Sequence, residues 1–470
     1  MKKPLCLLII SILFASNLFA KIKIASILGD NMVLQQNSVV KIWGTADVSQ
    51  KVTVSTNWNK DKITVVANDK GEWVAKISTT EAGGPYSIQI TAGKEKLSIS
   101  NILLGEVWLC SGQSNMEMPV KGYHNQPISN SNEFIATSEN QQIRLFTVQQ
   151  AYSLVEKTEV LGNWKVSKPE NVAEFSATAY FFGKMLQQVL GIPIGLINTS
   201  YGGTRIESWI SDSGLKDFDW VKLPEKNKAA GVSKQTPTAL YNAMIHPITN
   251  YKIRGAIWYQ GEANRREPDN YGKLLPALVE SWRNVWEIGD FPFYFVQIAP
   301  YGYVDTEGGL SSVYLREVQL EASKSIPNAG MACLIDIGEK NCVHPKDKKT
   351  TGNRLAYLAL SKTYGKKGIS FSGPVLKEMK IIQDVVKLTF ENAPNGLTSF
   401  GKDLTCFELA GSNKRFYQAK AIITGSGITL LSPNVTEPVA VRYAFKDFVV
   451  GELFNTEGLP ASSFRTDKWE

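Results

Sequence analysis

Hydrophobic and polar residues alternate in short runs from residue 21 to about residue 100. Four such runs, separated by Asn, Asp and Gly, are KVTVS (51–55), KITVV (62–66), WVAKI (73–77) and YSIQIT (86–91). Alternation with a period of two, interrupted by turn residues, is typical of the strands of a small β-sandwich. The pattern therefore predicts an N-terminal β domain over residues 21–100.

The pattern changes after Ile99, where apolar runs without alternation are interleaved with amphipathic stretches. The apolar runs are 103–110, 194–198, 254–260, 293–299 and 331–337, and the candidate helices are 174–190, 271–286, 312–326 and 348–363. Continuous apolar strands alternating with helices favour an α/β domain built on a doubly wound parallel sheet. We place it at residues 101–370. Alternating runs return at 380–390, 415–423, 427–431 and 438–445 and predict a C-terminal β region over 371–470.

The first 20 residues have the layout of a secretory signal peptide. Two lysines precede an apolar run, and Ala20 ends the stretch before Lys21. The run is shorter than the roughly 20 apolar residues that a membrane span needs, so cleavage near Ala20 is favoured over an anchor. We expect an exported protein, periplasmic or secreted, with no membrane contact after cleavage.

Composition narrows the possible partners. The chain is 43% hydrophobic and 20% charged, which is ordinary for a globular protein, and its net charge of +7 includes no run of Lys/Arg that approaches a nucleic-acid patch. Nucleic acid is therefore not an expected partner. No His/Cys cluster has the spacing of metal ligands, so we expect neither a metal nor a cofactor. Of the cysteines beyond the leader, Cys333 and Cys342 are the pair to test first for a disulfide.

Candidate chemistry begins at Ser114, four residues after the end of the apolar run 103–110. A serine at the carboxyl end of a parallel strand is well placed as a nucleophile, but it needs a neighbouring base. The chain has three histidines, His124, His246 and His344. His344 follows the run 331–337 at the same expected edge of the sheet, whereas His246 precedes a strand and His124 lies in a loop. Position therefore favours His344 as the base.

Two other strand ends carry groups that can stabilise an oxyanion. Gly202 and Gly203 follow the run 194–198 and can present backbone N–H groups without a Cβ in the way. Gln260 is the last residue of the run 254–260, and Glu262 and Asn264 come shortly after it. Ser, Gly-Gly, Gln/Asn and His at successive strand ends form a constellation that is far more specific than any one of these residues.

The chain resembles the sialate O-acetylesterase family, a branch of the SGNH (GDSL-like) hydrolases. The resemblance rests on LGEVWLCSGQSNMEMPV (104–120), NTSYGGTRIESWI (198–210), ALYNAMIHPI (239–248), IRGAIWYQGEAN (253–264), DIGEKNCVHPKDK (336–348) and EGLPASSFRTDKW (457–469). It implies a serine esterase that removes acetyl groups from sugar hydroxyls, on a flavodoxin-like three-layer fold. It further implies that Ser114 is the nucleophile and His344 the base. The implied oxyanion donors are Ser114 N–H, Gly203 or its neighbour Gly202, and Gln260 or Asn264.

The acid of a catalytic triad is not settled by this resemblance. Related hydrolases usually have aspartate three residues before the histidine, and here that position is Asn341. Asp336 is the acid that we favour. The alternatives are Glu339, or a Ser–His dyad whose imidazole is held by a backbone carbonyl or by Asn341.

The sequence gives less direct evidence of which sugar the enzyme binds. Arg205 follows the Gly-Gly-Thr loop and can pair with the carboxylate of a sialic acid, although an ion pair with Glu207 explains it equally well. We assign Arg205 and Glu262 to substrate binding. The expected substrate is O-acetylated sialic acid, with acetylxylan or another plant glycan as the alternative. A non-catalytic glycan-binding protein is the rival of another class, and the presence of both Ser114 and His344 argues against it.

Overall fold

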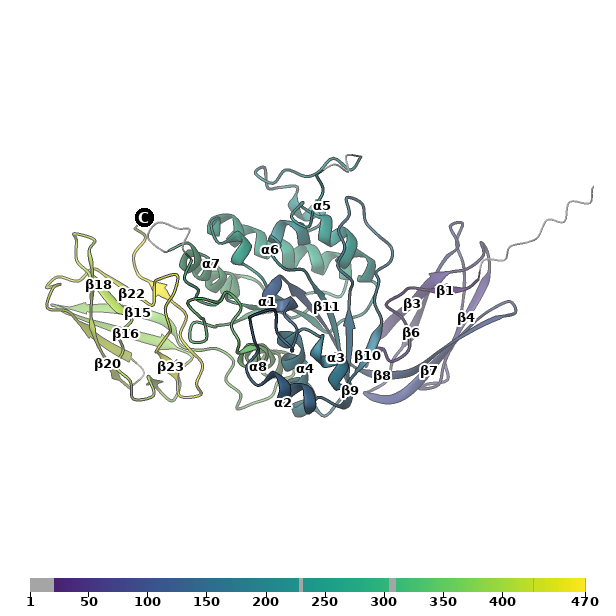
Figure 1. Cartoon of the computed structure of the whole chain (residues 1–470), viewed down its shortest axis with the longest axis horizontal. Coiled ribbons are helices and arrows are strands. Elements are labelled where there is room, and N and C mark those ends of the chain that lie inside the picture. The colour runs from purple at the N-terminus through teal and green to yellow at the C-terminus, as the bar shows by residue number, and fades with distance from the viewer. Residues whose placement is uncertain (1–20, 228–230, 304–309, 426, 470) are drawn as a thin grey trace, which may run out of the picture.

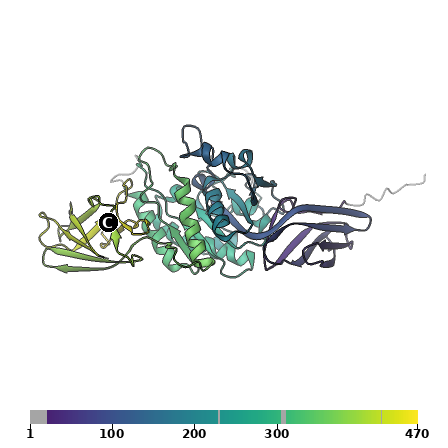
Figure 2. The same ribbon diagram turned by 90° about the horizontal axis from the view of Figure 1, so that it is seen from below.

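The computed structural model describes residues 21–227, 231–303, 310–425 and 427–469, and the predicted signal peptide lies outside them. Three units lie in a row, as Figure 1 shows and the view from below in Figure 2 repeats. A β unit at the N-terminal end is followed by a central α/β unit and by a second β unit at the C-terminal end. No helix within the described ranges combines the length and the apolar character that a membrane span requires.

The N-terminal unit consists of two layers of β-sheet. One contains β1 (Lys23–Ile24), β3 (Val39–Thr45) and β6 (Glu72–Ser78); the other contains β2 (Val33–Gln35), β4 (Lys51–Thr56), β5 (Lys62–Val66), β7 (Gly83–Ala92) and the start of β8 (Glu95–Gly112). Every second side chain of β6 is buried, as the alternation along its sequence requires. The strands predicted at 51–55, 62–66, 73–77 and 86–91 are confirmed.

Strand β8 belongs to two units at once. Its first half pairs antiparallel with β7 in the N-terminal unit. Residues 106–112 pair in parallel with β11 (Ile194–Ser200) and β12 (Gly255–Tyr259) in the central unit. The domain boundary expected at residue 100 therefore falls inside one continuous strand.

The central sheet has the order β10-β9-β11-β8-β12-β13-β14. The strands not yet bounded are β9 (Asn140–Thr147), β10 (Trp164–Ser167), β13 (Phe293–Val296) and β14 (Ala329–Ala332). All neighbours from β9 to β14 are parallel, and only β10 at the edge runs antiparallel. The carboxyl ends of six strands consequently meet along one edge of the sheet.

Helices cover both faces of this sheet. Trp258 of β12 packs into the same core as α6 (Pro268–Trp286) and α7 (Ser311–Ser325). Tyr259, the next residue, packs on the other side with α4 (Ala177–Leu190) and α8 (Lys348–Leu358). The α/β class is confirmed, and the four predicted helices begin within three residues of their expected starts. The short helices are α1 (Ser114–Glu117), α2 (Ser131–Ala136), α3 (Pro169–Ala173) and α5 (Asp212–Leu215).

The C-terminal unit is a second pair of antiparallel sheets. One has the order β15 (Val375–Ile382), β16 (Val385–Glu391), β21 (Gly427–Leu431), β20 (Lys420–Thr424), and the other β19 (Phe416–Gln418), β18 (Phe407–Ala410), β22 (Ala440–Tyr443), β24 (Phe464–Arg465). A short pair, β17 (Leu397–Thr398) and β23 (Phe454–Asn455), lies beside them. Leu388, Leu409 and Val441 share one buried core between the sheets.

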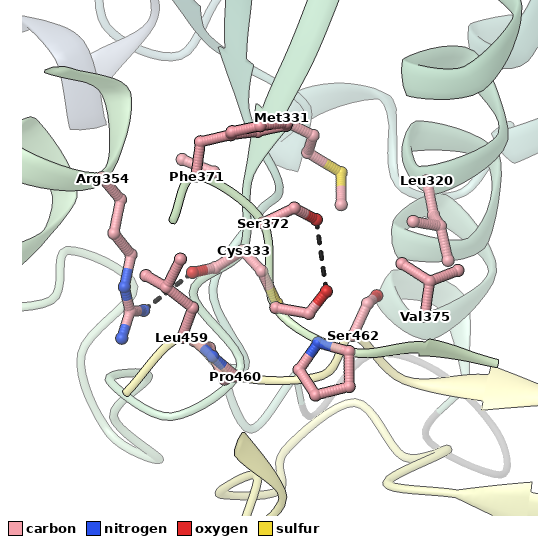
Figure 3. Close-up of a pocket in the computed structure, with 13 residues that line it drawn as sticks. Leu320, Met331, Cys333, Arg354, Phe371, Ser372, Val375, Leu459, Pro460 and Ser462 are labelled. Atoms are coloured by element: carbon pink, nitrogen blue, oxygen red, sulfur yellow. Dashed lines mark hydrogen bonds between the residues drawn. The ribbon is translucent and has the colours of Figure 1, made fainter. Parts of the chain in front are cut away.

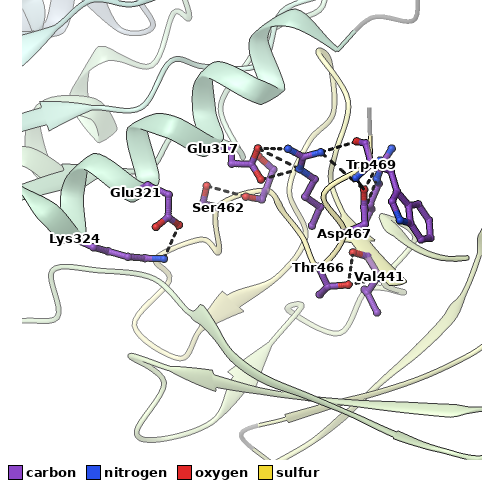
Figure 4. Close-up of polar contacts among 11 residues, drawn as sticks. Glu317, Glu321, Lys324, Val441, Ser462, Thr466, Asp467 and Trp469 are labelled. Atoms are coloured by element: carbon purple, nitrogen blue, oxygen red, sulfur yellow. Dashed lines mark hydrogen bonds and ion pairs between the residues drawn. The ribbon is translucent and has the colours of Figure 1, made fainter. Parts of the chain in front are cut away.

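Polar contacts join the C-terminal unit to the central one, and a small cavity lies between the two units. Glu317 of α7 accepts hydrogen bonds from Arg465 Nε and Nη2, both at 2.9 Å (Figure 4). Cys333, Phe371 and Ser462 line a cavity of about 20 Å³ at the junction (Figure 3). A cavity of this size holds about one water molecule and no sugar.

Cys333 and Cys342, the pair to test first for a disulfide, are not bonded to each other. All four cysteines of the described residues are free thiols. Cys333 Sγ donates to Gln297 Oε1 at 3.3 Å, and Cys342 Sγ donates to the carbonyl oxygen of His344 at 3.2 Å.

Candidate active site

Ser114 lies at the carboxyl end of β8, just after a turn that only glycine permits. Gly112 has a φ of +143°, and a Cβ at this position would lie 2.1 Å from the carbonyl oxygen of Tyr259. The Gln113 N–H then donates to that same oxygen at 3.0 Å. This close approach of β8 to β12 ends the strand abruptly and lets Ser114 begin α1 at the edge where the parallel strands end.

The structure brings His344 to Ser114 across 230 positions of sequence. His344 Nε2 lies 2.8 Å from Ser114 Oγ, and His344 comes from the loop between β14 and α8. The other two histidines are elsewhere. His246 Nδ1 lies 3.0 Å from the carbonyl oxygen of Lys157, and His124 is exposed. The juxtaposition expected from the strand ends is therefore present.

The second ring nitrogen of His344 contacts an amide rather than an acid. Nδ1 is hydrogen-bonded to Oε1 of Gln126, in the loop that follows α1. An amide oxygen only accepts, so Nδ1 carries the proton and Nε2 presents its lone pair to the Ser114 hydroxyl. Sequence reasoning missed Gln126; the one available signal was its place two residues after the candidate His124, in the same loop.

Burial and a nearby cation keep His344 neutral. Burial, and secondly the charge of Lys348, lower the pKa of His344 to about 4. The edge of the Tyr123 ring packs on the imidazole, with 5.4 Å between ring centroids. Burial and the Glu117 carboxylate raise the pKa of Tyr123, which keeps its phenol protonated. The imidazole is thus poised as a base rather than an acid near neutral pH.

Asp336, the acid expected to orient His344, does not reach it. Its two carboxylate oxygens accept hydrogen bonds from Nη1 and Nη2 of Arg354, each at 2.7 Å. The planar guanidinium of α8 matches the carboxylate with both of its terminal nitrogens and so holds it away from the imidazole. Glu339 instead accepts the Lys346 backbone N–H at 2.9 Å, and Asn341 is exposed. None of the residues considered from the sequence contacts His344 Nδ1.

Of the two glycines considered for the oxyanion hole, Gly202 is the one beside the serine. A Cβ built on Gly202 would lie 3.3 Å from Ser114 Cβ, whereas within the described residues one built on Gly203 meets only Lys234 Nζ. The Gly202 N–H donates to a carboxylate oxygen of Glu117. This arrangement differs from the expectation that Gly203 is the donor.

Gln260 and Asn264 are occupied by each other and by the segment around Arg205. Gln260 Nε2 donates to the Thr204 carbonyl oxygen at 3.0 Å and to Asn264 Oδ1 at 2.8 Å. Asn264 Nδ2 donates to Glu207 at 3.0 Å. Both N–H groups of the Gln260 amide therefore have partners away from Ser114, contrary to the expected oxyanion role.

The residues assigned to substrate binding also have protein partners. Arg205 pairs with Glu207 and Glu267, each at 2.8 Å, which is the alternative that the sequence left open for it. Glu262 is only 7% exposed, and its Oε1 accepts from Asn115 Nδ2 at 2.5 Å. The Glu262 carboxylate thus belongs to the interior beneath Ser114 and not to a sugar-facing surface.

Lys348 is the second functional candidate that sequence reasoning missed. The sequence predicts only that a helix starts at Lys348, yet its side chain is fully buried and Nζ donates to Asn115 Oδ1. Within the described part of the chain, no group of three or more His, Cys, Asp or Glu side chains is arranged to hold a metal ion.

Comparisons with known proteins show the family of the chain. The model of the carbohydrate esterase family of sialic acid-specific acetylesterases matches residues 104–361. Sialate O-acetylesterase of Mus musculus is 31% identical over 90% of this chain and 89% of its own length, and the Homo sapiens enzyme is 30% identical over 78% and 76%. The crystal structure of a carbohydrate acetylesterase from Xanthomonas citri, 33% identical, superposes with a TM-score of 0.88 over 95% of this chain and 100% of that one. The chain belongs to the sialic acid-specific acetylesterase family of carbohydrate esterases, and it is a carboxylic ester hydrolase.

Proposed function

We propose that the protein hydrolyses O-acetyl groups of sialic acid through an acetyl-enzyme formed on Ser114. The observation that carries the proposal is the 2.8 Å contact between Ser114 Oγ and His344 Nε2 at the carboxyl edge of the sheet. A serine hydroxyl is a weak nucleophile until a base takes its proton, and a neutral imidazole at this distance is such a base.

The first half of the reaction forms the acetyl-enzyme. His344 Nε2 takes the hydroxyl proton while Ser114 Oγ attacks the acetyl carbonyl carbon, and the carbonyl oxygen becomes an oxyanion. The C–O bond to the sugar then breaks, and the imidazolium returns its proton to the departing sugar oxygen. Throughout, the Nδ1–H bond to Gln126 holds the ring in the required tautomer.

The second half releases acetate. Water takes the place of the sugar, gives a proton to His344 Nε2 and attacks the acetyl carbon. Collapse of this second oxyanion breaks the bond to Ser114 Oγ, which recovers its proton from the imidazolium. No cofactor enters either half.

Backbone N–H groups supply the oxyanion donors in this proposal. Ser114 N–H is one of them, and the position of Gly202 beside Ser114 favours Gly202 over Gly203 as the glycine donor. Because Glu117 holds the Gly202 N–H, its carboxylate has to move aside before that donor can serve the oxyanion.

The central unit fits the SGNH type of doubly wound, three-layer fold. Its parallel strands, the helices on both faces and a nucleophile just after the carboxyl end of β8 support this assignment.

The signal peptide expected at residues 1–20 is the basis for proposing that the enzyme acts after export. N-terminal sequencing of the protein recovered outside the cytoplasm tests this, and a mature chain that begins at Lys21 is the expected result.

Acetate release tests both the mechanism and the sugar. Wild-type protein and Ser114→Ala are compared on O-acetylated sialic acid, on acetylxylan and on p-nitrophenyl acetate. We expect release from sialic acid that Ser114→Ala abolishes. A preference for acetylxylan would identify plant glycans as the substrate instead, because Ser114 and His344 act on the acetyl group and not on the sugar that carries it. A wild type no faster than Ser114→Ala on all three would reject the serine esterase.

A further inference from the structure

The side chain of Asn115 joins three segments that meet at the site. Asn115 follows the nucleophile directly, and its Nδ2 donates to Glu262 Oε1 at 2.5 Å and to the carbonyl oxygen of Val343 at 3.0 Å. Its Oδ1 accepts from Lys348 Nζ. Val343 precedes the base, Lys348 begins α8, and Glu262 follows β12. One amide therefore fixes the segment that carries Ser114 against the segment that carries His344.

Two of its partners are ionisable groups taken out of water. Lys348 is fully buried, with Nζ 5.3 Å from the centre of the Tyr259 ring, and Glu262 Oε2 is buried without a hydrogen-bond partner among the described residues. Burial lowers the pKa of Lys348 to about 7 and raises that of Glu262. Burying both groups opposes folding unless each stabilises the other, so their presence beneath the catalytic serine calls for a role in the reaction.

Lys348 also lies near the segment of the imidazole, since Asn115, which accepts from Lys348 Nζ, donates to the carbonyl oxygen of Val343, the residue before His344. The groups that touch the His344 ring are Ser114, Gln126 and the edge of Tyr123, none of which carries a charge near neutral pH. The Lys348 ammonium is the nearby charge that disfavours protonation of His344. The charged and titratable groups around Lys348 itself are Glu262 on the far side of Asn115, and Glu339, Cys342 and Asp347 on its own loop.

We propose that Lys348, Asn115 and Glu262 form a positioning bridge that holds the nucleophile and base segments in register, and that the bridge places the Lys348 ammonium where it opposes a positive charge on His344. This inference rests on the proposed roles of Ser114 and His344. The bridge touches neither substrate nor the reacting atoms; it acts through the two residues that do.

The pH dependence of kcat/KM for p-nitrophenyl acetate tests the charge of Lys348. Lys348→Met removes the ammonium, while Lys349→Met removes an exposed lysine one position along α8 and serves as the matched control. In Lys348→Met we expect the acid limb to move up by about one pH unit, so that kcat/KM below the new limb falls about tenfold. Lys348→Arg keeps a charge and should retain the wild-type limb. An acid limb in Lys348→Met that coincides with that of Lys349→Met overturns the electrostatic role.

Asn115→Ala tests the bridge separately from the charge. It removes the hydrogen bonds to Glu262, Val343 and Lys348 but leaves the ammonium in place. We expect kcat to fall at least about tenfold at every pH, with KM within about threefold of wild type and the acid limb unmoved. An unchanged kcat overturns the positioning role, and this variant decides the proposal if Lys348→Met does not fold. Loss of the parent activity in Ser114→Ala, measured alongside, shows whether a negative result concerns the bridge or the proposed function beneath it.

Discussion

The contact between Gln126 and His344 predicts how a carboxylate at position 126 would alter the enzyme. Gln126→Glu places a negatively charged carboxylate beside Nδ1 of His344 without changing the length of the side chain. An adjoining carboxylate raises the pKa of an imidazole by about one to three units. Starting from a pKa of about 4, the variant should titrate between about 5 and 7.

The size of the effect follows from the fraction of neutral imidazole. At pH 5, about nine tenths of the wild-type His344 is neutral, since its pKa is about 4. A rise of about two units leaves roughly one tenth neutral, so kcat/KM at pH 5 falls about tenfold. At pH 8 both proteins are deprotonated, and the carboxylate stabilises the imidazolium of the transition state, so Gln126→Glu should equal or exceed the wild type.

Gln126→Ala separates the hydrogen bond from the charge. A neutral hydrogen bond contributes about 0.5–1.5 kcal/mol, so its loss should lower kcat/KM by about two- to tenfold at every pH without moving the acid limb. The measurement is the hydrolysis of p-nitrophenyl acetate from pH 4 to pH 9. His124→Ala, an exposed change in the same loop, is the control. An acid limb in Gln126→Glu that stays at the wild-type pH would refute the assignment of Gln126 as the partner of Nδ1.

Three other substitutions test separate parts of the structure. Asp336→Ala leaves Arg354 buried without its carboxylate, so the free energy of unfolding measured in urea should fall by about 3–5 kcal/mol. The kcat of the folded variant should stay near that of the wild type, and a large fall in kcat would show that Asp336 takes part in catalysis. Because Arg205 is paired with Glu207 and Glu267, Arg205→Ala should change KM for acetylated sialic acid and KM for an uncharged acetyl ester by the same factor, and an increase confined to sialic acid would contradict this and show a carboxylate contact. Gly112→Ala should not yield folded protein, because its Cβ would lie 2.1 Å from the Tyr259 carbonyl oxygen; a soluble variant with wild-type melting and activity would contradict the stated need for glycine.

The pairing of Ser114 with His344 was predictable because parallel strands end along a common edge. Each residue follows an apolar run, and the alternation of strands with helices indicates that such runs lie parallel. That logic uses only the order of elements along the chain, which periodicity reveals well.

The partner of Nδ1 was not predictable on the same logic. Whether the Asp336 carboxylate faces the histidine or α8 depends on Arg354, eighteen positions later, whose side chain turns back from the helix toward the end of β14. Gln126 lies in a loop without periodicity, so no pattern indicates where its amide points. Side-chain pairing of this kind is decided by packing and not by spacing.

The length of β8 escaped prediction for another reason. The side chains of β8 alternate in burial up to about Asn101, and all of them are buried from Ile102 to Gly112. The reason is that the strand begins in the N-terminal sheet, which has one face exposed to solvent, and continues into the central sheet, which has helices on both faces. A change of period within one strand looks like the boundary between two elements.

That shared strand bears on how the enzyme can be taken apart. Residues 95–104 are held in register by β7, and the same backbone continues without a break to the turn that presents Ser114. The N-terminal unit therefore cannot be exchanged at a flexible linker. A chimera joined at residue 100 would have its junction inside β8, among residues that are hydrogen-bonded to β7. Grafted or minimal versions of this esterase should therefore keep the N-terminal unit together with the central one.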